Sequence, residues 1–162
     1  MAQPILTVMD ATAATAVTSW TVGEVKADQQ SPVLDVTVWN NKGGASDVSD
    51  VKEAAVTCLD GDGGDVSPMT TGLWMKVLVD TTAAVDDGGV KQYAGIGGAT
   101  QQPVRAQGVL AAEGAVIKGT ANDGTMENAL NNFAKASFKV APPFNAEPGV
   151  RSFRIRFLGY YT

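Results

Sequence analysis

The chain has 162 residues, of which 44% are hydrophobic and 18% are charged, and its formal net charge at pH 7 is −5. This length suits one domain with a real core, or one domain and a short appendage. Histidine is absent and Cys58 is the only cysteine. Ser-His-Asp catalysis, Cys-His catalysis and an intramolecular disulfide are therefore excluded, and a zinc site is strongly disfavoured because its usual ligands are missing.

The sequence also argues against membrane and nucleic-acid partners. No apolar run approaches the roughly 20 residues that a membrane-spanning helix requires. The start of the chain, MAQPILTVMD, lacks the basic residues and the long apolar stretch of a secretion signal. The acidic net charge disfavours binding to nucleic acid. We therefore expect a soluble product of the cytoplasm that binds neither membrane nor nucleic acid.

Short alternating runs separated by turn residues dominate the chain. Alternation with a period of two places successive side chains on opposite faces of a strand. Residues 10–19 are rich in Ala and Thr and predict a loop that leads into residues 20–25, and residues 126–132 are compatible with one helical turn. Strands or extended segments are predicted, in chain order, at residues 5–9, 33–40, 54–60, 73–80, 90–96, 103–110, 115–119, 133–140 and 153–157.

The last thirty residues show the clearest pattern. Apolar residues alternate with Lys and Ser at residues 133–140, and with Ser and Arg at residues 152–157. Pro142-Pro143 and Pro148-Gly149 supply turn chemistry between these runs. The pattern predicts two paired strands that form a closing C-terminal hairpin with one buried face and one solvated face.

These elements predict an all-β sandwich of antiparallel strands, because short strands recur with turn signals between them. A break at residues 29–32 divides the chain into an N-terminal β segment or arm, residues 1–30, and a sandwich domain, residues 31–162. The sequence leaves open whether the arm packs on its own domain or reaches another subunit. The two inner faces are predicted to bury Leu34, Val36, Val38, Val56, Val77, Phe138, Ile155 and Phe157.

One acidic segment invites a metal-binding interpretation that its spacing does not support. Asp60, Asp62 and Asp65 alternate with glycines, but an EF-hand loop that starts at Asp60 needs a glycine and a carboxylate where Asp65 and Thr71 stand. The segment is therefore predicted to be a turn between strands, without a metal. Nearby, Cys58 lies in an apolar run and is interpreted as a small buried hydrophobe.

Basic residues concentrate at the C-terminal end of this acidic chain. Residues 133–162 contain five basic residues and a single acidic one, Glu147. A basic strand pair on an acidic body predicts a surface that meets an acidic neighbour. The alternative is that these cations only keep an outer face soluble or guard an edge strand against unwanted pairing. The candidate contact residues are Lys135, Lys139, Arg151, Arg154, Arg156, Tyr160 and Tyr161.

Two groups of motifs resemble known families. The run VTVWNN with its glycine pair, and the run FKVAPPFNAEPGVRSFRIRF, are similar to immunoglobulin-like modules. More of the chain resembles a small family of virion proteins of tailed bacteriophages. The motifs that carry this second resemblance are Ser19-Trp20-Thr21-Val22-Gly23, residues 38–44 and 48–50, the strand from Trp74 to Asp80, Ile96-Gly97-Gly98, residues 119–125 and the C-terminal runs.

The resemblance implies an immunoglobulin-like sandwich and a non-enzymatic structural role in a phage particle. The protein is then expected in the virion, at the baseplate or tail-fibre attachment, docked to other copies of itself and to other virion proteins. No cofactor is expected. The same sandwich also suits a capsid decoration protein.

A second hypothesis is a carbohydrate- or receptor-binding module of the tail that binds a host-surface glycan. It requires exposed aromatic rings beside polar loop residues, and the candidates are Trp39 with Asn40 and Asn41, or Trp74. Tryptophan in core or inter-sheet packing is the competing interpretation, which also applies to Trp20. The enzyme that the composition still allows is a hydrolase with two carboxylates, but nothing in the sequence raises the pKa of one of them.

Overall fold

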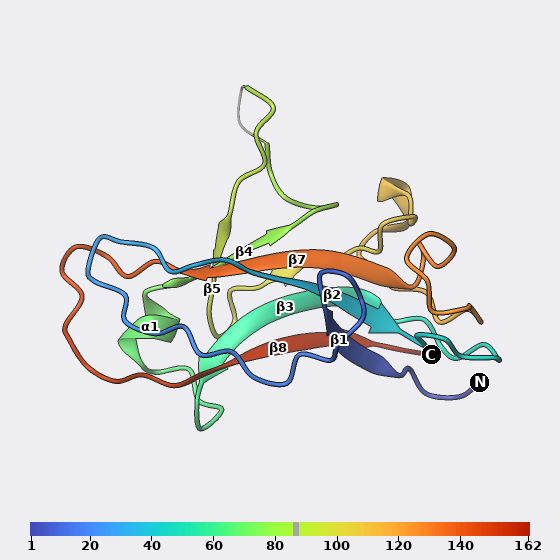
Figure 1. Cartoon of the computed structure of the whole chain (residues 1–162), viewed down its shortest axis with the longest axis horizontal. Coiled ribbons are helices and arrows are strands. Elements are labelled where there is room, and N and C mark those ends of the chain that lie inside the picture. Colours follow the sequence, from blue (N-terminus) through green and yellow to red (C-terminus); the bar gives the residue numbers. More distant parts are fainter. Residues whose placement is uncertain (86–87) are drawn as a thin grey trace.

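Two antiparallel β-sheets packed face to face make up the protein (Figure 1). The computed structural model describes residues 1–85 and 88–162. The all-β sandwich that the sequence predicts is confirmed. Its elements are β1 (Leu6–Asp10), β2 (Leu34–Asn40), β3 (Lys52–Asp60), α1 (Pro68–Thr71), β4 (Met75–Val79), β5 (Ala94–Ile96), β6 (Gln102–Pro103), a short 3₁₀ helix (Ala111–Glu113), β7 (Phe133–Val140) and β8 (Phe153–Tyr160).

The strand order places β7 at the centre and β8 at an edge. One sheet has the order β1-β2-β7-β4-β5, and the other has the order β6-β3-β8. Each neighbouring pair is antiparallel. No helix in the described part of the chain is long and apolar enough to cross a membrane.

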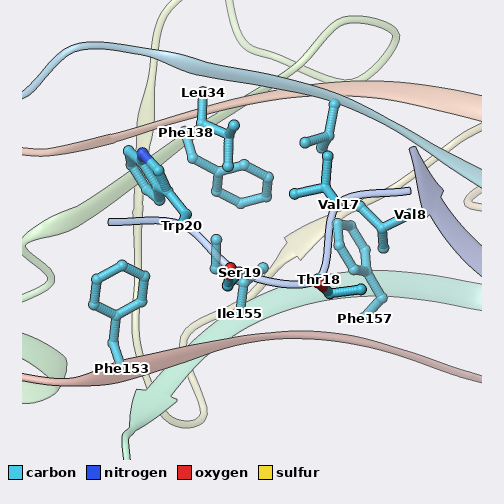
Figure 2. A pocket seen from close by; sticks show the side chains of 11 residues that line it. Val8, Val17, Thr18, Ser19, Trp20, Leu34, Phe138, Phe153, Ile155 and Phe157 are labelled. Atoms are coloured by element: carbon cyan, nitrogen blue, oxygen red, sulfur yellow. The ribbon is translucent and has the colours of Figure 1, made fainter. Parts of the chain in front are cut away.

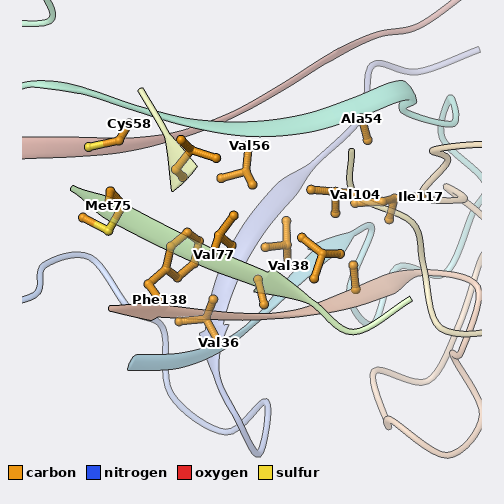
Figure 3. Close-up of a cluster of buried hydrophobic side chains, with 14 of the residues drawn as sticks. Val36, Val38, Ala54, Val56, Cys58, Met75, Val77, Val104, Ile117 and Phe138 are labelled. Carbon is orange, nitrogen blue, oxygen red and sulfur yellow. The ribbon is translucent and has the colours of Figure 1, made fainter. Parts of the chain in front are cut away.

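The period-two pattern explains which side chains face the space between the sheets. Val36 and Val38 of β2, Phe138 of β7 and Val56 of β3 are at most 3% exposed and pack in one cluster with Val77 of β4 (Figure 3). Of the eight predicted core residues, these five are buried. Leu34, Ile155 and Phe157 are only half-buried and pack against the cluster from its open side. Cys58 belongs to this cluster, and burial raises the pKa of its thiol to about 12.

The predicted C-terminal hairpin is wrong, because β7 and β8 lie in different sheets. β7 pairs with β2 and β4, whereas β8 pairs with β3. Residues 141–152 carry the chain from one sheet to the other (Figure 1). Two strands that face each other across a sandwich show the same alternation as two paired strands, since each buries one face. Phe138 and Phe157 meet across the core instead, with their ring centroids 6.2 Å apart.

A second, smaller apolar cluster lies on the outer side of β2 and β7. The rings of Trp39 and Phe133 stack with centroids 4.6 Å apart and are at most 1% exposed. Met9 and Ala13 from the N-terminal residues, and Ala129 from the loop before β7, complete the cluster. The alternation in β2 places Trp39 on the face away from the main core, and this packing shields that face from solvent.

Several weaker predictions of secondary structure are not reproduced. Within residues 103–110 only Pro103 is in a strand, residues 115–119 contribute one isolated bridge at Ile117, and residues 126–132 form turns. Residues 20–25, into which the predicted loop leads, belong to no helix or strand. Residues 103–110 and 115–119 form isolated backbone hydrogen bonds with β3, such as Val104 N–H to the carbonyl of Ala54 at 2.7 Å and Ala54 N–H to that of Ala115 at 2.8 Å.

Candidate interaction surface

β8 presents the longest free edge of the sandwich. It has eight residues and is the last strand of its sheet. On the side away from β3, no backbone hydrogen bond joins β8 to another residue that the structure describes. A row of unpaired N–H and C=O groups of this kind can pair with a strand from another chain.

The outer face of β8 carries a pair of arginines without ionic partners. Arg154 and Arg156 are exposed and lie opposite Leu59 and Thr57 of β3. Neither guanidinium forms an ion pair or a hydrogen bond with any described residue. Their positive charge is therefore available to an acidic partner.

The predicted basic lysines lie on the other sheet and do not extend this surface. Lys135 is exposed on β7, and the ammonium of Lys139 lies 4.0 Å from the centroid of the Tyr93 ring and donates to Oε1 of Gln30 at 2.9 Å. Burial, and after it the Asp35 carboxylate, raise the pKa of Tyr93. Because β7 and β8 are in different sheets, the expectation of one basic strand pair is corrected to two separate basic patches.

Arg151 lies just before β8 and is engaged within the chain. Its guanidinium lies 5.2 Å from the centroid of the Trp74 ring and donates a 3.4 Å hydrogen bond to the carbonyl oxygen of Glu147. Stacking of a guanidinium on an aromatic face stabilises both groups. Arg151 therefore contributes less free charge than Arg154 and Arg156.

Two tyrosines continue the surface beyond the arginines. Tyr160 ends β8 opposite Lys52 and is 47% exposed, and Tyr161 is 48% exposed. The ammonium of Lys52 donates to the hydroxyl of Thr162 at 3.2 Å. This contact holds the end of the chain beside β3, so that both rings stay at the surface.

An apolar groove runs beside β8, between the edges of the two sheets. Its volume is about 320 Å³, and Figure 2 shows Val17 and Trp20 lying within it. None of its lining residues carries an acid or a base, so it offers no group for general acid-base chemistry. Its walls include Val8, Leu34 and Phe138 of one sheet, and Phe153, Ile155 and Phe157 of β8 in the other.

The carbohydrate platform expected at Trp39, Asn40 and Asn41 is not formed, because all three side chains are buried. They are at most 3% exposed. The Asn40 amide accepts from the backbone N–H of Ile5 and donates to the carbonyl of Ser49, both at 3.0 Å. The asparagines therefore tie loops to the end of the sandwich. The interpretation of tryptophan as packing holds for Trp39 and for Trp74, which is 8% exposed beneath Arg151.

The Asp60 carboxylate is surrounded by donors from its own chain. The backbone N–H groups of Val66 and Ser67 each donate to Oδ2 at 3.0 Å, and the hydroxyls of Ser67 and Thr70 donate to Oδ1. The hydrogen bond from the Ser67 hydroxyl, followed by the one from the Thr70 hydroxyl, is the main cause that lowers the pKa of Asp60 to about 2. Residues 60–65 form the predicted turn, and no metal-binding cluster of three or more acidic or Cys side chains occurs in the described ranges.

We expect Asp60→Asn to remove a pH-dependent part of the stability. A carboxyl whose folded pKa is lowered stabilises the fold above its unfolded pKa, and this stabilisation is lost as the pH falls through the folded pKa. The melting temperature of the native protein should therefore exceed that of the variant at neutral pH, and the gap should close between pH 3.8 and about 2.

Asp62→Asn is the matched control for this prediction. Among the described residues, the Asp62 carboxylate accepts one hydrogen bond, from the backbone N–H of Gly64 at 2.8 Å. The control should show a much smaller gap at neutral pH. A gap for Asp60→Asn that does not change between neutral pH and pH 2 would contradict the role given to the ionised carboxylate.

Comparison with known proteins assigns no family. No family model matches the chain, and no curated protein matches it. Among solved structures, a family 123 glycoside hydrolase from Clostridium perfringens is similar, with 15% sequence identity and a TM-score of 0.32. The similarity covers 83% of this chain and 19% of that enzyme, so the chain spans about a fifth of its length. A TM-score this low carries no argument for a shared fold or activity.

Proposed function

We propose that this protein is a non-enzymatic structural and assembly protein of a bacteriophage particle, placed at the baseplate or the tail-fibre attachment. It docks through β8 onto acidic surface of a neighbouring copy or of another virion protein. The observation that carries the proposal is the free edge of β8 together with the unpaired charges of Arg154 and Arg156. The sequence resemblance to phage virion proteins supplies the setting.

The chemistry of the surface supports docking better than catalysis. The free edge offers backbone hydrogen bonds to an incoming strand, and the arginines select a partner of opposite charge. Apolar contacts beside the edge supply most of the affinity, whereas complementary charge sets orientation and rate. The groove beside β8 contains no titratable side chain.

Reversal of the two arginine charges tests the proposal. We expect Arg154→Glu with Arg156→Glu to leave the fold intact, because both side chains are exposed, and to lower incorporation into particles at least about tenfold. Incorporation is measured by quantitative mass spectrometry of purified particles from cells that supply only the variant. Circular dichroism verifies that the variant is folded.

Lys42→Glu with Lys76→Glu is the matched control. It changes the net charge by the same amount on the other sheet, where Lys76 belongs to β4 and Lys42 follows β2, and neither residue is a candidate contact. The control should be incorporated like the native protein. Equal incorporation of both double variants, or absence of the native protein from particles, would overturn the proposal.

A further inference from the structure

The first 27 residues cover the open side of the sandwich. After β1, the chain runs along the groove, where Val17 and Trp20 point among the side chains of both sheets (Figure 2). The Trp20 ring meets Phe153 edge-on, with centroids 5.8 Å apart. Further on, Val22 and Val25 line a second hollow of about 440 Å³ near Trp74. This segment therefore packs its side chains between the two sheets, without forming backbone hydrogen bonds to the edge of β8 in the described part of the chain.

β1 pairs with β2 along its length, but the part of this segment after Val17 is held weakly by its backbone. Val17 N–H donates to the carbonyl of Val8 at 2.9 Å. Following the chain, the next residue whose backbone is hydrogen-bonded is Lys26, whose carbonyl accepts from Gln29 N–H at 3.1 Å. Between them, residues 18–25 form no hydrogen bond with any residue that the structure describes. Side-chain packing alone fixes them, and such segments open at low free-energy cost.

A strained turn separates this segment from the rest of the chain. Residues 26–29 form the turn, and Asp28 has a φ of 61°, in the left-handed region that favours glycine. The anchored part of the chain begins within the turn, where Asp28 N–H donates to the carbonyl of Pro142 at 3.1 Å, and continues after it, where Ser31 N–H donates to that of Val140 at 2.9 Å. The turn is therefore a hinge between a loosely held segment and a fixed body.

We propose that residues 1–27 form an exchangeable arm, and that its partner is a second copy of this chain. The arm contacts the edge of β2 and the groove, and both surfaces belong to residues 34–157. A second copy presents the same surfaces, so exchange keeps every contact and relieves the strain at Asp28. Strained hinges of this kind favour exchange of elements between copies.

When each copy places its arm on the next copy, the copies are joined head to tail, and such an arrangement produces rings or filaments. The inference deepens the proposed function, because it names how copies join within the assembly. It does not depend on the arginines of β8. Arg154→Glu with Arg156→Glu should leave arm exchange unchanged, so failure of either proposal is recognised separately.

A disulfide between copies tests the exchange directly. Val8 of β1 lies opposite Val38 of β2, and the Val8 carbonyl points away from β2 because it accepts from Val17. Such a non-hydrogen-bonded pair has Cα atoms about 4.5 Å apart, which a disulfide spans. Val8→Cys and Val38→Cys are made in separate, differently tagged full-length chains that also carry Cys58→Ala.

We expect the two chains, refolded together and oxidised, to yield a dimer that mass spectrometry identifies as position 8 of one chain linked to position 38 of the other. The dimer fraction should rise with protein concentration. Val8→Cys mixed with Phe144→Cys, at an exposed loop position, measures collisional cross-linking. A mixed dimer no more abundant than this background, at the highest soluble concentration, overturns the proposal.

Substitutions at the hinge test its physical cause. Asp28→Gly removes the strain and should lower the exchanged fraction by about fivefold. Asp28→Pro forbids the observed φ, removes the N–H that binds Pro142 and should raise the exchanged fraction. Glu53→Gly relieves a positive φ of 47° outside the arm and should leave the fraction unchanged. An exchanged fraction that is equal in all three variants also overturns the proposal.

Discussion

Phe138→Ala is expected to lower the free energy of unfolding by about 3–5 kcal/mol, the typical cost of removing a buried aromatic ring. Phe138 is 1% exposed at the centre of the larger sheet and meets Phe157 of the opposite sheet. Its ring is therefore part of the contact that joins the two sheets. Removing it leaves a cavity beside Phe157 that the rigid flanking strands cannot close. Urea unfolding, followed by tryptophan fluorescence, measures the change.

Phe144→Ala is the matched control, since it removes the same ring from the surface. Phe144 is 79% exposed in the connection between β7 and β8, and we expect a change within about 0.5 kcal/mol. Equal losses for the two variants would mean that the sheets do not depend on the contact at Phe138.

Asn40→Asp is the second large effect that we expect, a loss of at least about 3 kcal/mol at neutral pH. The Asn40 amide is fully buried, and its Nδ2 donates to the carbonyls of Ser49 at 3.0 Å and Ile117 at 3.3 Å. The substitution keeps the shape but replaces this donor with an oxygen that faces two carbonyl oxygens. An ionised carboxylate at this buried position is desolvated and faces two carbonyl oxygens, both of which disfavour its charge.

The loss should depend on pH in a defined direction. Burial and the two carbonyls raise the folded pKa of the introduced carboxyl above its unfolded value. Its neutral form then supports folding below the unfolded pKa of about 4, and this support is lost as the pH rises. Melting curves from pH 4 to pH 8 should show a widening gap to the native protein. Asn145→Asp, at an exposed loop position, is the control, and a constant gap for Asn40→Asp would contradict this account.

The sequence by itself determined the fold class and much of the core. Period-two alternation in β2, β4, β7 and β8 specified which face of each strand is apolar, because burial of one face requires that pattern. Val36, Val38, Val56, Val77 and Phe138 are buried as predicted. The turn at residues 60–65 and the burial of Cys58 also followed from local chemistry. The absence of histidine was decisive for the classes of catalysis that the chain cannot perform.

The candidate surface was predicted only in part. Basic candidates were found by their charge, but the structure places Lys135 and Lys139 in one sheet, Arg154 and Arg156 in the other, and Arg151 in the loop before β8. Arg151 and Lys139 are engaged by Trp74 and Tyr93, which are distant in the sequence. The roles of the remaining residues in docking, and the division into residues 1–30 and 31–162, stay predictions.

Only the tertiary structure decided which strands are neighbours. A strand with one apolar face satisfies its pattern equally well beside its sequence neighbour or across the core from it, so alternation could not place β7 and β8. That placement depends on contacts between segments far apart in the chain, such as Phe138 with Phe157 and Trp39 with Phe133. The free edge of β8 and the weakly bonded residues 18–25 beside it follow from the same long-range packing, which no local pattern of residues encodes.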